Sequence, residues 1–339
     1  MTSEIQYEQG VGKVTRVRDD AVTAVMVLTW ALLSLAAAFR WLGPGRDYFE
    51  YLYYYNNIPY QFALSDTRFE PGFHVVAWFF RNLLNVEYSV FALTIVAFSL
   101  GIKFYLMRRY LVHPILAMFT YIALFYPTHE YAQIRTAFAL ALGYGAIHLM
   151  FERRYLAGVV GFVVGFTFHY SVLMLSIVYF GAQYVRGRLA IIFLVAGLVF
   201  VSVFSDQFIS AATDMFSAYN PLLKYYVSNS YFNEEVRITS LNNILPAAAL
   251  FLAVFLGWFG YGRYHATFLT MSIASLVAIV LLSGSPVVAQ RLKELLFVAV
   301  IFLVYRSPIV LRNLPPIVLI WANAALLLYL AFREGLLAI

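Results

Sequence analysis

The sequence has no cysteine and very little charge. None of its 339 residues is Cys, and Asp, Glu, Lys and Arg together make up only 12%. The missing cysteine excludes disulfides, thiolate metal sites and a cysteine nucleophile. The scarcity of charge excludes an ordinary soluble globule, because soluble domains carry about 25% charged residues to cover their surface. A chain of this composition needs lipid as part of its solvent.

Apolar and aromatic residues fill the place of the missing charge, at 63% and 18% of the chain. Such a surface is stable in a bilayer, where the backbone must satisfy its own hydrogen bonds in helices. We therefore predict an all-α polytopic membrane protein with about 10–11 transmembrane helices, outer-face loops and interfacial helices. The apolar runs that predict these spans are 21–42, 88–106, 111–127, 134–150, 155–168, 170–184, 189–205, 244–261, 266–282, 293–305 and 315–332.

Short basic clusters between the runs determine the predicted orientation. Cytoplasmic loops are enriched in Lys and Arg. If segment 71–85 does not cross and 155–184 crosses twice, a cytoplasmic N-terminal tail (1–20) puts all the basic clusters inside. These are Arg108–Arg109, Arg153–Arg154, Arg186 with Arg188, Arg263, and Arg306 with Arg312. This predicts one transmembrane domain over 21–339, with outer loops at 43–87 and 206–243. The net charge of +6 then reflects topology, and no nucleic-acid partner is expected.

The block Gly45–Glu70, GRDYFEYLYYYNNIPYQFALSDTRFE, is polar and rich in tyrosine. Asp47, Tyr51 and Tyr54 recur at helical spacing and would share one face of a helix. Tyrosine suits stacking on a sugar, and it equally suits an aromatic belt at the membrane interface. The carboxylates of Asp47 and Glu70 could orient an arginine, bind sugar hydroxyls or act as a base.

Two arginines stand where the positive-inside rule disfavours them, at the predicted outer ends of spans. Arg135 follows Gln133, and Arg291 follows Gln290. A guanidinium presents a planar fork of donors that matches phosphate oxygens, and a helix N-terminus adds further donors. A lipid diphosphate is the expected ligand of these four side chains. The alternative is that the arginines reach lipid headgroups or pair with Glu130 or Glu294.

His169, in GFTFHYSVLML, falls at the predicted outer turn between two short spans. A neutral imidazole there could act as a general base or bind a sugar hydroxyl, or it could simply be satisfied by the backbone. The histidines and carboxylates match no zinc pattern, and no P-loop, GxSxG or DxD motif occurs in a meaningful context. A nucleotide-driven enzyme is therefore disfavoured, and the donor of any group transfer would already be activated in the membrane.

The order of these segments resembles the EpsG family of polysaccharide-assembly membrane proteins, related in role to the Wzy polymerases. GRDYFEYLYYYNN and RFEPGFHVVAWFF come first, then QIRTAFALALGYGAIHLM with the basic turn FERRY, then FVVGFTFHYS and QRLKELLFV. The resemblance covers most of residues 20–310. The best-matched positions are Asp47, Tyr51, Glu70, Gly72, Arg135, Ala139, His169 and Arg291.

The resemblance implies a polymerase of undecaprenyl-diphosphate-linked oligosaccharide repeat units, for O-antigen or exopolysaccharide, at the outer face of the bacterial cytoplasmic (inner) membrane. Donor and acceptor would both be lipid-linked glycans, and a chain-length regulator and a flippase would be partners. The diphosphate would lie on Arg135, Arg291, Gln133 and Gln290. His169, Asp47 or Glu70 would deprotonate the acceptor hydroxyl, and Tyr51 and Tyr54 would bind sugar. Neither a metal nor a cofactor is expected.

Two other activities fit part of this pattern. A GT-C-type polyprenyl-phosphate-sugar glycosyltransferase also places an acidic residue in its first outer loop, as Asp47 would be, but commonly uses a metal and a larger outer domain. A lipid-linked oligosaccharide flippase or transporter should carry charges along a central cavity, whereas the ionisable residues here cluster near span ends. Metal dependence would favour the first, and lipid flipping without glycan extension would favour the second.

Overall fold

The computed structural model describes residues 16–45, 47–63, 69–185, 240–258, 262–282, 286–306 and 314–333. Over these residues the chain is helical, with two short π-helical turns and no strand, which confirms the all-α class. The predicted span 189–205 and nearly all of the predicted loop 206–243 lie outside the described residues.

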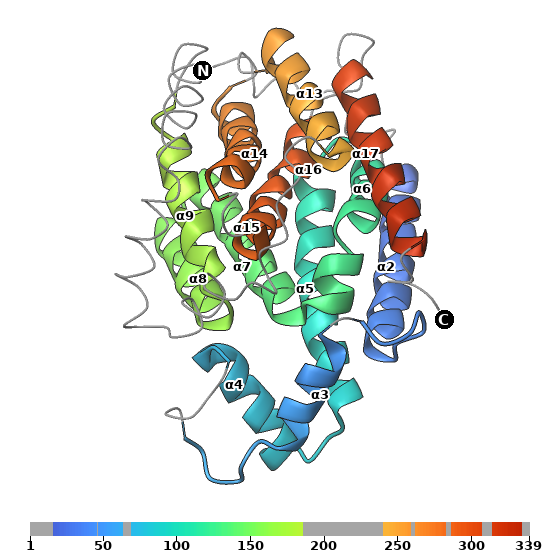
Figure 1. The fold of residues 1–339 in the computed structure, drawn as a ribbon, viewed down its shortest axis with the longest axis vertical. Helices are drawn as coiled ribbons and strands as arrows, with labels where there is room; N and C mark the ends of the chain where they lie inside the picture. The colour runs from blue at the N-terminus through green and yellow to red at the C-terminus, as the bar shows by residue number, and fades with distance from the viewer. Residues whose placement is uncertain are drawn as a thin grey trace.

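Most of the described helices form one bundle (Figure 1). Four are long and apolar enough to cross a bilayer: α2 (Arg16–Ala38), α5 (Tyr88–Tyr110), α7 (Ile134–Phe151) and α14 (Arg263–Leu281). The remaining bundle helices are α6 (Pro114–Leu124), α8 (Tyr155–Phe168), α9 (Ser171–Ala182), α13 (Leu241–Phe255), α15 (Pro286–Phe297), α16 (Ala299–Val304) and α17 (Leu314–Arg333). The predicted division of 155–184 into two helices is confirmed, since α8 and α9 are separate and meet at His169 and Tyr170.

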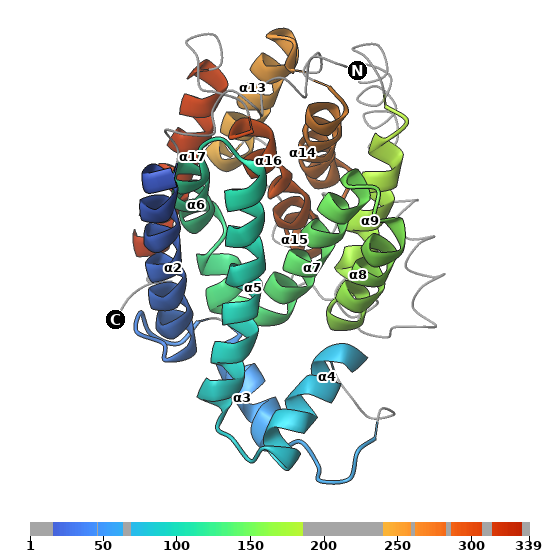
Figure 2. The same ribbon diagram turned by 180° about the vertical axis from the view of Figure 1, so that it is seen from behind.

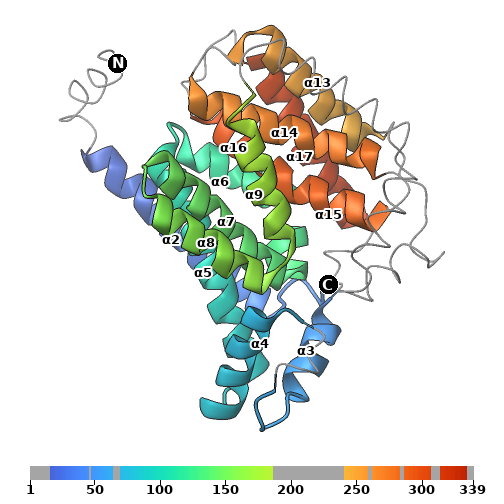
Figure 3. The same cartoon turned by 90° about the vertical axis from the view of Figure 1, so that its left-hand side faces the viewer.

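Segment 71–85 does not run alongside the bundle. It forms α4 (Pro71–Trp78) and the π-helical turn η1 (Phe79–Leu83), which with α3 (Tyr48–Asn56) make a lobe beyond one end of the bundle (Figures 2 and 3). We call residues 47–63 and 69–84 the α3–α4 lobe. An apolar helix this short cannot cross a bilayer, which needs about 20 residues.

Aromatic packing attaches the α3–α4 lobe to α5. Tyr51 and Tyr55 face inward on α3, whereas Phe49 and Tyr53 on its other face are 64% and 73% exposed. The Tyr55 ring stacks on Phe91 with centroids 5.1 Å apart, and its hydroxyl donates to the Val86 carbonyl at 2.9 Å. The tyrosine density of the block therefore has a structural use on one face of α3 and leaves an aromatic surface on the other.

Arginines of the predicted cytoplasmic loops lie at the end of the bundle opposite the lobe, where α5 and α7 finish (Figure 1). Arg109 Nη2 donates to Glu152 Oε1 at 2.7 Å, and Arg306 Nη1 donates to the Tyr110 carbonyl at 3.0 Å. Arg263, which begins α14, lies at the same end. The two ends of the bundle therefore differ in chemical character.

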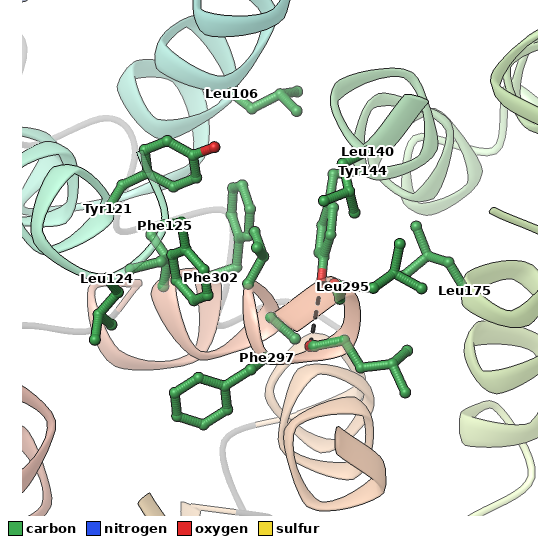
Figure 4. Close-up of a cluster of buried hydrophobic side chains, with 14 of the residues drawn as sticks. Leu106, Tyr121, Leu124, Phe125, Leu140, Tyr144, Leu175, Leu295, Phe297 and Phe302 are labelled. Atoms are coloured by element: carbon green, nitrogen blue, oxygen red, sulfur yellow. Dashed lines mark hydrogen bonds between the residues drawn. The ribbon is translucent and has the colours of Figure 1, made fainter. Parts of the chain in front are cut away.

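A buried aromatic cluster fixes α15 against α7 (Figure 4). The Tyr144 hydroxyl of α7 donates to the Leu295 carbonyl at 3.1 Å, and its ring stacks on Phe302 of α16 at 5.6 Å. The sequence predicts one span over 293–305, but the structure begins the helix at Pro286 and interrupts it at Val298. An apolar run marks only the buried part, so it misses the polar turns of α15 that carry Arg291.

The turn before α7 also differs from the prediction. Residues 128–133 are predicted to be an outer loop, but Pro127–Ala132 form a π-helical turn, η2, and Glu130 is fully buried. Its carboxylate accepts from Lys103 Nζ of α5 at 2.5 Å and from the Tyr121 hydroxyl at 2.8 Å. The suggested pairing of Arg135 with Glu130 is therefore wrong, because the buried Lys103 pairs with that carboxylate. The sequence does not indicate this lysine as a partner of Glu130.

Candidate functional site

The centre of the site is an ion pair between the lobe and the bundle. Arg135 is the second residue of α7, and Glu70 directly precedes Pro71, the first residue of α4. Arg135 Nη1 donates to Glu70 Oε2, and the two side chains are only 17% and 7% exposed. The backbone of Glu70 is extended (φ −60°, ψ 147°), and α4 begins at the next residue. The chain therefore changes direction where the Glu70 carboxylate contacts the bundle.

Aromatic rings enclose the Arg135 guanidinium. Its Cζ lies 4.0 Å from the centroid of the Phe69 ring, 5.5 Å from that of Tyr51 and 5.8 Å from that of Phe73. Its Nε also donates to the Tyr51 hydroxyl at 3.3 Å. Rings at these distances attract a cation through their quadrupoles and keep water away from it. Sequence reasoning missed Phe69 and Phe73, although both flank Glu70 at positions that a helix start would bring to one side.

The two predicted sugar-binding tyrosines make contacts within the protein. The Tyr51 ring is 3% exposed and packs between Phe69 and Arg135. The Tyr54 ring lies 4.4 Å from Phe69, its hydroxyl bonds His74 Nδ1 at 2.5 Å, and burial raises the pKa of Tyr54 to about 12. Contact of Tyr51 and Tyr54 with sugar stays a prediction, whereas the structure shows that they pack around Arg135 and Phe69.

His169 lies on the other side of Glu70, in the turn between α8 and α9. Its Nδ1 is 3.8 Å from Glu70 Oε1, and it accepts the backbone N–H of Ser171 at 3.2 Å. An Nδ1 that accepts carries no proton, so the neutral ring holds its proton on Nε2. Burial, together with the charges of Arg135 and Arg291, lowers the pKa of His169 to about 3. The ring is therefore neutral at physiological pH and presents an N–H donor.

Arg291 and Asp47 belong to the same neighbourhood. Burial raises the pKa of Tyr51, while the charge of Arg135 lowers it, that of Asp47 raises it and that of Arg291 lowers it. The charge of Arg291 also acts on His169. Since α3, α7, α15 and the α8–α9 turn are distant in the sequence, tertiary structure alone brings these groups together.

The two predicted glutamines are placed differently from the arginines. Gln133 joins η2 to α7 and is half-buried, and its backbone N–H donates to the His129 carbonyl at 2.8 Å. Gln290 Nε2 donates to Glu294 Oε1 at 2.9 Å, one turn further along α15. The Gln290 amide thus orients the carboxylate nearest to Arg291 in the sequence, and its part in diphosphate binding stays a prediction.

Gly72 permits the close approach that brings Glu70 to His169. A Cβ at Gly72 would lie 2.4 Å from Thr167 Oγ1 and 2.9 Å from the Thr167 carbonyl oxygen, in the last turn of α8. Contacts under 3.0 Å to backbone force one element to move, so only glycine allows α4 to dock here. The lobe is therefore held against the bundle at the site itself.

We expect Gly72→Ala to reduce activity by at least tenfold, because displacing α4 moves Glu70 away from Arg135, and misplacement of about 1 Å can cost 100-fold. The matched control is Gly181→Ala in α9, where an added Cβ meets nothing within 4 Å. Product formation and thermal unfolding of both variants in detergent check this. Equal activity of the two variants would contradict the docking role.

His169 also makes stability depend on pH. Its pKa falls from 6.5 to about 3 on folding, so the unfolded chain binds a proton below pH 6.5 that the folded chain rejects. The free energy of unfolding must therefore fall as the pH is lowered, by about 2 kcal/mol between pH 7 and pH 5 for this one group. We expect His169→Asn, whose Oδ1 can still accept the Ser171 N–H, to lose this part of the dependence. Denaturant unfolding in micelles measures the free energy of unfolding of the wild type and of the variant at pH 7 and pH 5. All other groups contribute equally to the two proteins, so an equal loss of stability in both would disprove this prediction.

The assembled groups suit an anionic ligand. Two guanidiniums and a neutral imidazole N–H come from three parts of the bundle, and the carboxylates of Glu70 and Asp47 come from the lobe. In the part of the chain that the structure describes, no three His, Asp or Glu side chains are grouped so as to hold a metal ion. The arrangement can bind a diphosphate at the arginines and take a proton at a carboxylate.

Comparison with known proteins gives one match. The sequence model described as the EpsG family matches residues 23–333. This stretch includes every residue of the candidate site, from Asp47 to Arg291. No curated protein and no solved structure matches the chain.

Proposed function

The chain belongs to the EpsG family, whose members are Wzy-like polysaccharide polymerases, and from this premise we propose its substrate, place of action and residue roles. The protein polymerises undecaprenyl-diphosphate-linked oligosaccharide repeat units at the outer face of the bacterial cytoplasmic membrane. The observation that carries the proposal is the buried Arg135–Glu70 pair beside His169, on which the charge of Arg291 also acts.

The reaction transfers a glycan from its lipid diphosphate to a hydroxyl of a second lipid-linked unit. The bond between the anomeric carbon and the diphosphate oxygen breaks, and its electron pair leaves with undecaprenyl diphosphate. The acceptor oxygen forms the new glycosidic bond and gives up its proton to a base. Negative charge grows on the leaving diphosphate, so fixed cations beside it lower the barrier.

Arg135 and Arg291 are proposed to bind the diphosphate and stabilise this charge. Arg135 is held by rings and by Tyr51, so little reorganisation is needed when the charge develops. The two guanidiniums supply charge that a metal supplies in other glycosyltransferases, and we expect activity to persist in a chelator.

The base is proposed to be a carboxylate rather than the imidazole. The Nδ1 lone pair of His169 already accepts the Ser171 N–H, and Nε2 carries the proton. His169 therefore donates Nε2–H to the diphosphate or to a sugar hydroxyl, and Glu70 or Asp47 takes the acceptor proton. Tyr51 serves the site by holding Arg135, while the exposed rings of Phe49 and Tyr53 offer a surface for sugar.

The two ends of the bundle support the proposed orientation. Arg109, Arg263 and Arg306 gather at the end opposite the lobe, and the positive-inside rule assigns that end to the cytoplasm. The lobe and the site then face outward, the N-terminus is cytoplasmic, and lipid-linked units arrive after a flippase has moved them. A chain-length regulator would act on the same side.

The test is polymerisation by the purified protein in liposomes that contain lipid-linked repeat units. We expect a ladder of extended glycans and release of one undecaprenyl diphosphate for each bond formed, with or without a chelator. Extension that stops in the chelator would favour a metal-dependent glycosyltransferase. Movement of labelled lipid between leaflets without extension would favour a flippase and contradict the proposal.

A further inference from the structure

The Glu70–Arg135 ion pair has a consequence for the order of the reaction. We propose that the Glu70 carboxylate occupies the donor's diphosphate position on Arg135 before the donor binds, and that donor binding displaces it and frees it as the base for the acceptor hydroxyl. This inference rests on the proposed function and deepens it, by choosing between the two candidate carboxylates.

The surroundings of Arg135 require an anionic partner. Its side chain is 17% exposed and is enclosed by Phe69, Tyr51 and Phe73. A cation in such a place is costly without an anionic partner, because burial removes its hydration. Glu70 is the partner that the protein itself supplies.

An arriving diphosphate would meet a guanidinium whose donors are already in use. Nη1 of Arg135 already donates to Glu70 and Nε to Tyr51, so the face that a diphosphate needs is partly occupied by a carboxylate. Two anions at one guanidinium repel each other. A diphosphate carries more charge than one carboxylate and is attracted by the charge of Arg291 as well, so it takes the guanidinium and the carboxylate moves.

The Glu70 carboxylate can move while the backbone stays in place. Glu70 precedes Pro71, and α4 stays docked because Gly72 fits against Thr167. Rotation about the side-chain bonds of Glu70 is sufficient to break the pair. The other oxygen, Oε1, already lies beside the His169 ring, 3.8 Å from Nδ1, so a small rotation away from Arg135 leaves the carboxylate within the site.

The exchange couples donor binding to base release. While Glu70 Oε2 accepts a hydrogen bond from Arg135, the carboxylate is fixed against the guanidinium and cannot turn toward an acceptor hydroxyl. Once free, the carboxylate takes the acceptor's hydroxyl proton as the oxygen attacks the anomeric carbon and the bond to the diphosphate breaks. The resulting carboxylic acid then returns its proton to water and re-forms the pair with Arg135. Donor must therefore bind before the acceptor is activated.

A purely structural role for Glu70 predicts different behaviour. If Glu70 only positions Arg135, its removal should weaken diphosphate binding and lower activity together. If Glu70 competes with the diphosphate, its removal should tighten binding while it lowers activity. Tighter diphosphate binding together with lower activity is expected only if Glu70 exchanges with the diphosphate on Arg135.

The experiment measures binding of glycan-free undecaprenyl diphosphate, and separately polymerisation, for the wild type and Glu70→Gln in nanodiscs. We expect the variant to bind the lipid diphosphate on the order of tenfold more tightly, a common size for coupling between ligands. Its polymerisation rate should fall at least 100-fold, as for loss of a general base. The matched control is Glu87→Gln, an exposed carboxylate before α5, which should leave both quantities unchanged.

Unchanged or weaker binding by Glu70→Gln would overturn the inference, and so would retained polymerisation. Failure of the wild type to bind the lipid diphosphate at all would instead refute the proposed function. If Glu70→Gln does not fold, Glu70→Asp replaces it. Its shorter carboxylate should also release Arg135, so tighter binding with reduced polymerisation is again expected, and weaker binding again overturns the inference.

Discussion

Arg135→Lys is expected to lower the rate of polymerisation by about 100-fold, the usual cost of losing one preorganised donor at a developing negative charge. Lysine keeps the charge but lacks the planar fork that reaches two oxygens at once. It also cannot lie flat on Phe69, whose ring centroid is 4.0 Å from the guanidinium carbon. The rate of glycan extension at saturating lipid-linked substrate measures the effect.

The control for this substitution is Arg109→Lys at the opposite end of the bundle. Arg109 also pairs with a glutamate, Glu152, at 2.7 Å, but its side chain is 49% exposed. We expect that variant to keep wild-type activity. Full activity of Arg135→Lys would show that a point charge suffices there, and the diphosphate role of Arg135 would have to be abandoned.

Lys103→Met is expected to have the largest effect on stability. Lys103 and Glu130 are 2% and 0% exposed, and removal of one member leaves the other charge buried without its partner. Such a loss typically costs about 3–5 kcal/mol. Replacement of both members by Lys103→Met with Glu130→Gln should recover much of this, because no net charge is then buried. Denaturant unfolding in micelles compares the single and double variants.

A surface pair serves as the reference for this cycle. Arg109→Met breaks the exposed pair with Glu152 and should cost far less stability than Lys103→Met, because solvent screens an exposed ion pair. If the double variant were as unstable as Lys103→Met alone, the buried charge would not be the cause. The outcome matters for the site, because Glu130 holds η2, which leads directly into α7 and Arg135.

The sequence alone predicts the helices well where their signal is local. The apolar runs 88–106 and 134–150 correspond to α5 and α7, because a stretch long enough to cross a bilayer is recognisable without its neighbours. The division of 155–184 into α8 and α9 also follows from the sequence, since the positive-inside rule requires an even number of crossings there. The number of basic residues is sufficient to identify the end of the bundle opposite the α3–α4 lobe.

Features that depend on a partner distant in the sequence are not predicted by the sequence alone. Glu130 was expected in an outer loop and is buried, because Lys103, 27 residues away, neutralises it. An apolar pattern does not detect the polar turns of α15, which are stabilised by packing against α14 and by the hydrogen bonds of Lys293 to Asn242 and Asn243 of α13. Hydropathy describes the average preference of a residue type for burial or for water. An ion pair or a buried carbonyl changes that preference at one position.

The sequence by itself determined that this is an all-helical membrane protein of the EpsG family, and it singled out Asp47, Glu70, Arg135, His169 and Arg291. Only the tertiary structure decided that Glu70 pairs with Arg135, 65 residues away, and that His169 Nδ1 is occupied by the Ser171 N–H. Residue type shows what chemistry a side chain can perform. Which proton it carries and which charge it faces depend on distances of a few ångströms between helices, and these arise only when the chain has folded.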